Sequence, residues 1–169
     1  DLVQRVQLLN SLGYNVMISD YTRYFSLRAY FRQYTKMNIG IVVGMINLRQ
    51  IFEEESYRGV QGGIMEGLGK LFSDNTRMFI YPELSKDEEL RDYSNMKVPD
   101  HLRFLYRHLL ENDFLTGLET GDIGLMKIYS RDVLKSLKIG RGDWEEMVPK
   151  LVAEQIVEDG LFGFKKKRR

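Results

Sequence analysis

Polar residues that can hold a phosphate follow the first two predicted strands of the chain. These strands are residues 15–19 and residues 39–43, and the residues of interest after them are Asp20, Thr22, Arg23, Gly44 and Asn47. In an open parallel sheet, ligands bind beyond the carboxyl ends of the strands, where helix N-termini and arginine side chains can hold an anion. The sequence therefore predicts a ligand site at these two strand ends. In the alternative, Asp20 and Asn47 only cap helices and the arginines face water.

A second candidate is a glycine-rich segment at residues 59–69. It fits neither the Rossmann fingerprint nor the P-loop. Gly63 and Gly67 share one face of a predicted helix, where each glycine costs roughly 0.5–1 kcal/mol relative to alanine. A close neighbour must therefore approach this face, and it is a helix or strand, a ligand or a partner subunit. The amides of Gly62 and Gly63 at the helix start can also bind an anion.

Composition removes several other kinds of chemistry. The 169 residues include no cysteine, so thiolate nucleophiles, disulfides and cysteine metal sites are excluded. The two histidines, His101 and His108, are two helical turns apart, about 10 Å, which is too far to share a metal ion. No metal site is predicted. The net charge of +1 argues against wholesale binding of nucleic acid. No apolar run approaches the roughly 20 residues of a membrane helix, so we expect a cytoplasmic domain.

Strand and helix patterns alternate along the first half of the chain. Short apolar runs predict strands at residues 15–19, 39–43 and 77–81, and residues 125–129 offer a fourth. The run at 39–43 lacks polar alternation, which predicts a central strand buried on both faces. Helical spacing predicts helices at residues 2–12, at 64–72 and after a Thr22 or Asp20 cap. The pattern favours an α/β fold: an open, mostly parallel sheet of three to four strands with helices on both faces.

The later part of the chain reads as helical. Pro99 and Pro149 suit helix starts, Ser130 can cap a helix, and Gly160 suits a helix end. The single tryptophan, Trp144, is predicted to anchor the C-terminal helix rather than to stack on a base.

The chain reads as one domain followed by a charged tail. No repeat or low-complexity linker divides residues 1–164, so we expect a single α/β domain with a helical C-terminal part. Residues 165–169 are all basic, and without them the net charge falls from +1 to −4. Such a run is a solvated tail or linker remnant, or it contacts phosphates or lipids. A start without methionine suggests a fragment of a longer protein.

Two stretches resemble a group of conserved bacterial proteins that are loosely labelled nicotinate-nucleotide adenylyltransferase-like. They run from Ile39-Gly40-Ile41-Val42-Val43-Gly44 to Tyr81-Pro82, and from Trp144-Glu145-Glu146-Met147-Val148-Pro149 to Phe164. Ser130, in Ser130-Arg131-Asp132-Val133-Leu134, resembles the serine near the end of nucleotidylyltransferases. The resemblance implies that Ser130 and the following helix N-terminus hold nucleotide phosphates. The superfamily's H-x-G-H or T-x-x-H motif is absent, so the chain corresponds at most to a C-terminal part.

Two functions remain open. One is a nucleotide- or phosphometabolite-binding domain, as part of a nucleotidyl-transfer enzyme that works by positioning and charge stabilisation. The other is a non-catalytic interaction or assembly domain that uses its glycine-rich and aromatic faces, since the chain has 10 Tyr and 9 Phe. Its partner would be a second copy or the rest of a longer polypeptide. The sequence identifies no cofactor and does not decide whether the chain is an enzyme.

Overall fold

The computed structural model describes residues 2–85 and 87–164, and these residues form two compact units. The sheet unit is residues 20–121. The helical unit consists of residues 2–19 together with residues 122–164. The expectation of one domain over 1–164 did not include this division. The basic tail at 165–169 lies outside the described residues.

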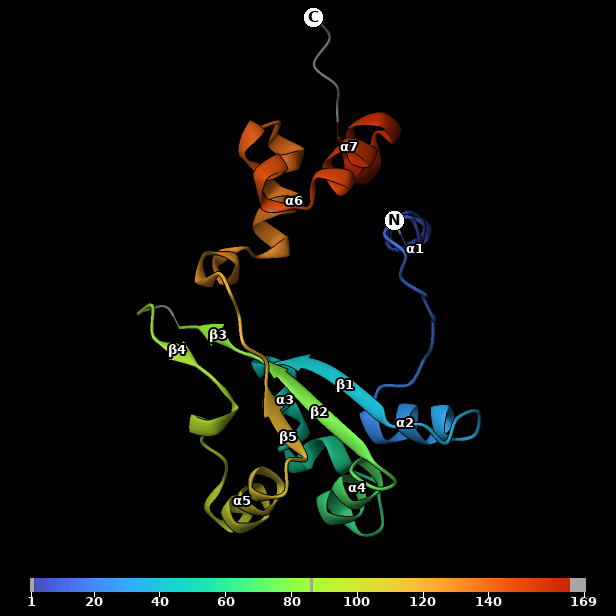
Figure 1. The fold of residues 1–169 in the computed structure, drawn as a ribbon, viewed down its shortest axis with the longest axis vertical. Helices are drawn as coiled ribbons and strands as arrows, with labels where there is room; N and C mark the ends of the chain where they lie inside the picture. Colours follow the sequence, from blue (N-terminus) through green and yellow to red (C-terminus); the bar gives the residue numbers. More distant parts are fainter. Residues whose placement is uncertain (1, 86, 165–169) are drawn as a thin grey trace, which may run out of the picture. The chain divides into compact units, whose positions relative to one another are not determined.

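A three-stranded parallel sheet forms the centre of the sheet unit. Its strands are β1 (Ile39–Gly44), β2 (Thr76–Tyr81) and β5 (Leu115–Gly117), in the order β1-β2-β5. Ile39 is paired with Thr76 and Met78 with Leu115. Figure 1 shows the three strands side by side. The predicted open, parallel α/β sheet is therefore confirmed with three strands. Two further short strands, β3 (Glu83–Leu84) and β4 (Leu90–Arg91), form a separate antiparallel pair.

The connections between the strands carry the helices of the sheet unit. Helix α2 (Tyr24–Arg32) precedes β1, and α3 (Met45–Ile51) and α4 (Gly63–Leu71) connect β1 to β2. Helix α5 (Arg103–Glu111) leads into β5. The short 3-10 helices are η1 (Glu54–Tyr57), η2 (Tyr93–Asn95) and η3 (Asp100–Leu102). Apolar side chains of α3, α4 and α5 form one core with Val43, Met78, Ile80 and Leu115 of the sheet.

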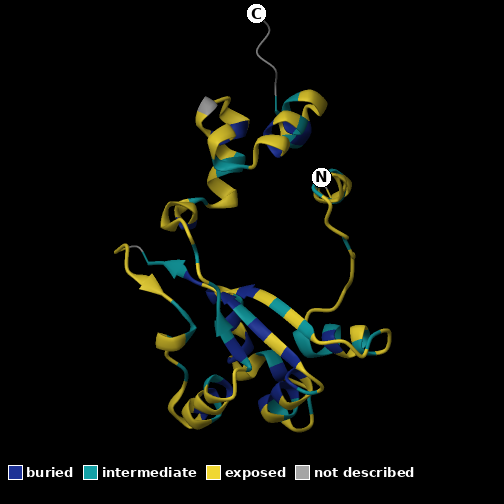
Figure 2. Ribbon diagram, in the orientation of Figure 1, coloured by how far each residue is buried: buried dark blue, intermediate teal, exposed yellow. Residues whose placement is uncertain are grey.

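Within the sheet unit, helices cover only one face of the sheet. Burial alternates along β1 and β2: Val43, Met78 and Ile80 are buried, whereas Val42 and Tyr81 are exposed. Figure 2 shows this alternation as bands along the two strands. The prediction of helices on both faces is therefore not met inside this unit. This is unusual for a parallel sheet, whose faces are normally both covered.

The prediction that residues 39–43 form a central strand is wrong. The strand exists, but β1 is at the edge and β2 is central. The apolar run indicated a strand buried on both faces because two of the three residues on the uncovered face, Gly40 and Gly44, have no side chain. Without a polar residue at those positions, the strand shows no alternation, although only one of its faces is buried.

Two other predicted strands are also wrong. Residues 15–19 form no helix or strand, and most of them are exposed, so the sheet begins at Ile39. Residues 123–127 form the 3-10 helix η4 (Ile123–Lys127) in place of a fourth strand. The carboxylate of Asp122 caps this turn by accepting the amide of Gly124 at 2.7 Å. The third strand, β5, is only three residues long and was not predicted.

The helical unit has its own core around Trp144. Its helices are α1 (Leu2–Ser11), α6 (Ser130–Ile139) and α7 (Lys150–Asp159), with the 3-10 helices η5 (Gly142–Met147) and η6 (Leu161–Gly163). Helix α7 ends at Gly160, whose φ of +62° is favoured by glycine. Trp144 packs with Leu137 of α6 and Ile156 of α7. Its predicted role as an anchor for the C-terminal helix is confirmed within this unit. Across the described residues, no helix is long and apolar enough to span a membrane.

Candidate functional site

The structure brings two of the predicted ligand-binding residues together at a small cavity. Thr22 and Arg23 line a cavity of about 200 Å³ at the start of α2. Its other polar lining residues are Tyr24, Gln50, Glu53, Ser56 and Tyr57. The cavity is smaller than the roughly 300–1,000 Å³ of typical ligand pockets. It has room for a small polar molecule and not for a whole nucleotide.

Arg23 is held in place at the edge of this cavity. Its Nη2 donates to the carbonyl oxygen of Arg58 at 2.7 Å, and its guanidinium lies 5.9 Å from the centre of the Phe25 ring. Arg23 is also the N-cap residue of α2, and no side chain caps this helix. The predicted cap by Thr22 or Asp20 is therefore wrong.

The other predicted residues lie at different places. Asn47 donates to the hydroxyl of Tyr24 at 2.7 Å, and Tyr24 lines the cavity. Asn47 therefore contacts a wall residue of the cavity without lining the cavity itself. Gly44 is the N-cap residue of α3, so Asn47 does not cap that helix. Asp20 is exposed and does not line the cavity. Ser130 begins α6 in the helical unit, and its side chain does not cap that helix.

The arginine that follows β1 is neutralised at the strand ends. Arg49 forms an ion pair with Glu83, in which one nitrogen of the guanidinium contacts both carboxylate oxygens at 2.7 and 2.8 Å. Both side chains are partly buried. This ion pair offsets the charge that Arg49 contributes at the carboxyl edge of the sheet.

The amides of Gly62 and Gly63 are not free to bind an anion. The Gly62 amide donates to the carboxylate of Glu66 at 2.7 Å, and the Gly63 amide donates to the carbonyl of Val60 at 3.0 Å. Glu66 also pairs with Lys70 at 2.5 Å, and these two interactions hold the pKa of Glu66 below its usual value. The start of α4 is therefore capped by its own chain, contrary to the anion-binding prediction.

The close approach predicted at Gly67 is real, and the approaching group is the ring of Tyr57. A Cβ atom at Gly67 would lie 2.1 Å from Tyr57 Cε1. The ring is also stacked on Phe25, with centroids 6.1 Å apart, and its hydroxyl donates to the carbonyl of Ile51 at 2.7 Å. Burial raises the pKa of Tyr57 to about 12. At Gly63 no atom lies near, and the glycine serves a φ of +57°.

We expect the substitution Gly67→Ala to destabilise the protein. Helix propensity alone would stabilise α4 by up to about 1 kcal/mol, but the new methyl group would overlap Tyr57, and overpacking typically costs about 1–3 kcal/mol. The free energy of unfolding in urea measures the balance. Gly69→Ala is the matched control, because no atom lies within 4 Å of its Cβ position. A stabilised Gly67→Ala protein would show that Tyr57 moves aside without cost.

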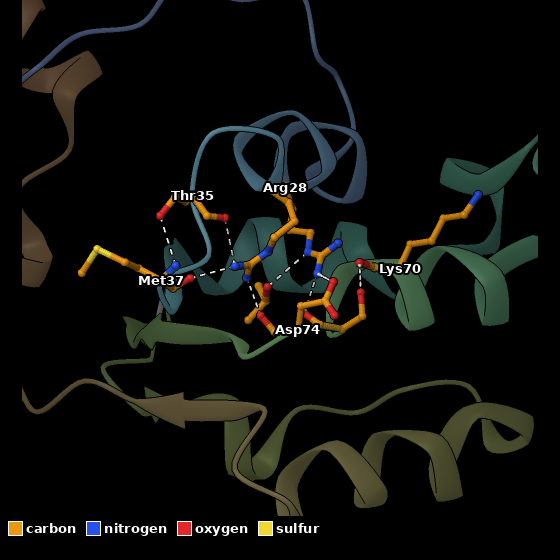
Figure 3. Close-up of polar contacts among 8 residues, drawn as sticks. Arg28, Thr35, Met37, Lys70 and Asp74 are labelled. Atoms are coloured by element: carbon orange, nitrogen blue, oxygen red, sulfur yellow. Dashed lines mark hydrogen bonds and ion pairs between the residues drawn. The ribbon is translucent and has the colours of Figure 1, made fainter.

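A second polar cluster, which the sequence reasoning missed, holds the end of α2 to the turn before β2. Arg28 is buried and donates to Thr76 Oγ1 at 3.2 Å, to the Ser73 carbonyl at 2.8 Å and to the Asp74 carboxylate at 2.5 Å. Arg32 donates to the carbonyls of Met37 and Asp74. Figure 3 shows Arg28 directed at Asp74 of this turn. Because Arg28 and the terminal nitrogens of Arg32 donate to protein acceptors, we interpret the cluster as structural, although Arg32 Nε is buried without a hydrogen-bond partner among the described residues.

The pairing with Arg28 gives the stability of the protein a specific pH dependence. Hydrogen bonding and charge attraction from Arg28 hold the pKa of Asp74 below its usual value. This contribution is present above the unfolded pKa of about 3.9 and is lost as the pH falls through the lower folded pKa. We expect the wild-type protein to lose more stability than Asp74→Asn in that window. Asparagine tolerates the left-handed backbone of residue 74, whose φ is +49°. If the free energies of unfolding in urea of the two proteins fell equally as the pH is lowered, this expectation would be contradicted.

The outer side of β1 has no neighbouring strand among the described residues of the sheet unit. The Ile39 amide donates to Asn75 beside β2, so the amides of Ile41 and Val43 also point to β2. The backbone groups of Gly40 and Val42 therefore point outward, and no hydrogen bond joins them to another described residue. Val42 is 65% exposed and Tyr81 is 38% exposed on the uncovered face beside this edge. We call this edge and face the open side of the sheet.

Gly40 shapes the open side. A Cβ atom there would lie 2.9 Å from Cε2 of Phe79, so the absence of a side chain lets the half-buried Phe79 ring lie across β1. The strand has no charged residue and no proline, which are the usual devices that prevent an edge strand from pairing. The open side thus offers backbone hydrogen-bonding groups next to a face that carries Val42, Phe79 and Tyr81 together with the exposed Arg77.

Comparisons with protein-family models, curated proteins and solved structures give no match. The resemblance to nicotinate-nucleotide adenylyltransferase-like proteins therefore stays a prediction.

Proposed function

We propose that the sheet unit is a non-catalytic interaction domain that binds an extended polypeptide segment along β1. The observation that carries the proposal is the open side: an edge strand without a charged residue or proline beside an uncovered, largely apolar face. The outward groups of Gly40 and Val42 lie at the spacing at which the backbone of a second, extended strand can hydrogen-bond to them. Val42, Phe79 and Tyr81 would contact alternate side chains of that segment.

An exposed aromatic cluster on α2 and on both sides of it in the sequence adds to the support. The ring of Tyr30 lies 5.5 Å from that of Tyr21 and 5.1 Å from that of Tyr34. Tyr34 is 72% exposed, and Phe31 is also exposed. Aromatic residues are enriched in protein interfaces. On the glycine-rich face of α4, in contrast, the ring of Tyr57 already occupies the position beside Gly67.

A peptide-display experiment tests the proposal. Random peptides selected on the protein should be extended and rich in alternating β-branched residues. Val42→Pro removes the outward amide and should weaken the binding of these peptides at least about tenfold, because several backbone and side-chain contacts depend on this position. Val42→Ala keeps the amide and is the control. Equal binding to the Val42→Pro protein would show that the peptides do not pair with β1.

A second candidate function is the binding of a small phosphorylated metabolite or a nucleotide phosphate group at the Thr22–Arg23 cavity. It is favoured by the lining of this cavity, where the predicted ligand residues Thr22 and Arg23 lie together with the polar residues Ser56 and Gln50. A ligand at 100 times its Kd would add about 2.7 kcal/mol of stability, which thermal shift detects. Inorganic phosphate and adenine nucleotides are the probes, and Arg23→Ala should remove any shift. Without a shift in the wild-type protein, this candidate fails.

A further inference from the structure

The helical unit contains an acidic groove. It lies between η5 and α7 and has a volume of about 540 Å³. Its rim carries the carboxylates of Glu145, Glu146, Glu154 and Glu158, and all four residues are exposed. The floor is apolar and is formed by Val148, Ala153 and Val157. We call it the acidic groove.

The charge of the acidic groove is only partly compensated from within. Lys150 lines the groove and pairs with Glu154 at 3.8 Å. With four glutamates and one lysine, the lining keeps a charge of −3. A ligand that complements it must be cationic and must carry apolar stems for the floor, and a run of lysine and arginine side chains has both properties.

The chain supplies such a run where the description of the helical unit ends. Residues 165–169 are Lys-Lys-Lys-Arg-Arg, and they directly follow Phe164. The Phe164 ring packs edge-on against Trp144, with centroids 5.7 Å apart, and Trp144 immediately precedes Glu145 on the rim. Five extended residues span up to about 17 Å. Phe164 packs in the same hydrophobic cluster as the groove residues Val148, Ala153 and Val157, so the tail is joined to the cluster that forms the floor of the groove.

We propose that the basic tail, residues 165–169, docks in the acidic groove of its own chain. The aliphatic stems lie along Val148, Ala153 and Val157, and the charged ends meet the rim glutamates. In this state the groove's charge of −3 offsets part of the tail's charge of +5, so the tail is less available to other anionic partners. The proposal is independent of the open side, which belongs to the sheet unit.

Paramagnetic relaxation in NMR tests the proposal on the whole chain. Because the protein has no cysteine, Arg169→Cys carries a single nitroxide label and leaves four basic residues in the tail. We expect broadening of the amide signals of Glu145, Glu146, Glu154 and Glu158. At 1 M salt, where the Debye length is about 3 Å, the broadening should disappear. Unbroadened groove signals at low salt would overturn the proposal.

Two controls make the result specific. Glu154→Gln with Glu158→Gln should abolish the broadening, whereas Glu53→Gln with Glu55→Gln changes the charge equally in the sheet unit and should not. Broadening that survives the groove substitutions would contradict docking at this site. In a mixed sample, ¹⁵N protein without a nitroxide is combined with ¹⁴N protein that carries the nitroxide. Broadening in this sample reports contact between copies. Groove broadening that appears only in the mixed sample would overturn docking within one chain.

Discussion

The substitution Trp144→Ala is expected to cost about 3–5 kcal/mol, the range for deleting a buried tryptophan side chain. Trp144 is only 1% exposed and lies at the centre of the helical core, against α6, α7 and Phe164. The total free energy of unfolding of a small domain is only about 5–15 kcal/mol, so the helical unit should unfold at a low urea concentration. Backbone NMR signals of the two units report this directly.

A matched control lies on the same unit. Leu151 is on α7 and is 51% exposed, so Leu151→Ala should change the stability by less than about 1 kcal/mol. The sheet unit has a separate core, and its signals should persist in the Trp144→Ala protein. A Trp144→Ala protein as stable as Leu151→Ala would show that Trp144 does not organise the helical core.

The substitution Arg28→Leu is expected to cost about 2–4 kcal/mol. Leucine keeps part of the apolar stem, but it leaves the buried Thr76 hydroxyl and the Ser73 carbonyl without their donor. Each buried polar group that loses its partner costs about 1–3 kcal/mol. Urea unfolding followed by circular dichroism measures the loss.

The control for Arg28 is an arginine with an exposed ion pair. Arg107 donates to Glu111 at 2.7 Å on the surface of α5, and Arg107→Leu should change the stability by less than about 1 kcal/mol. Equal effects of the two substitutions would mean that the Arg28 contacts are replaced by water at no cost.

The fold class could be predicted because apolar runs mark strands and helical spacing marks helices. The predictions of β2 and α4 were confirmed, since each combines a clear apolar pattern with a Pro, Asn or Gly boundary. The position of β1 could not be predicted. A run of apolar residues interrupted by glycine reads the same in a central strand as in an edge strand, and the difference lies in which neighbours are present.

The candidate site was predicted less well, because its residues were chosen from an incorrect strand. Asp20 was selected as the residue after a strand at 15–19, which does not form. Thr22 and Arg23 meet the polar residues Gln50, Glu53 and Ser56 through the packing of α2, a contact that no local pattern encodes. Gly67 was identified correctly as a point of close approach, since an unfavourable residue within a helix signals a steric need. Its partner, Tyr57, could be found only from the structure.

The burial of Arg28 could not be predicted from the sequence. A charged residue on an otherwise apolar helix face reads as a solvent contact, yet here it is buried because the turn at residues 73–76 supplies three acceptors. Sequence spacing gives no sign of that turn, since it is brought to α2 by a chain segment more than 40 residues away.

Amide hydrogen exchange along residues 39–44, with and without a display-selected peptide, tests the central claim most directly. In the free protein, the amides of Ile41 and Val43 should be protected by β2, and those of Gly40 and Val42 should exchange rapidly. Addition of the peptide should slow exchange at Gly40 and Val42 and leave the other two unchanged. Peptide binding that leaves the exchange of Gly40 and Val42 unaltered would contradict strand pairing along the open side.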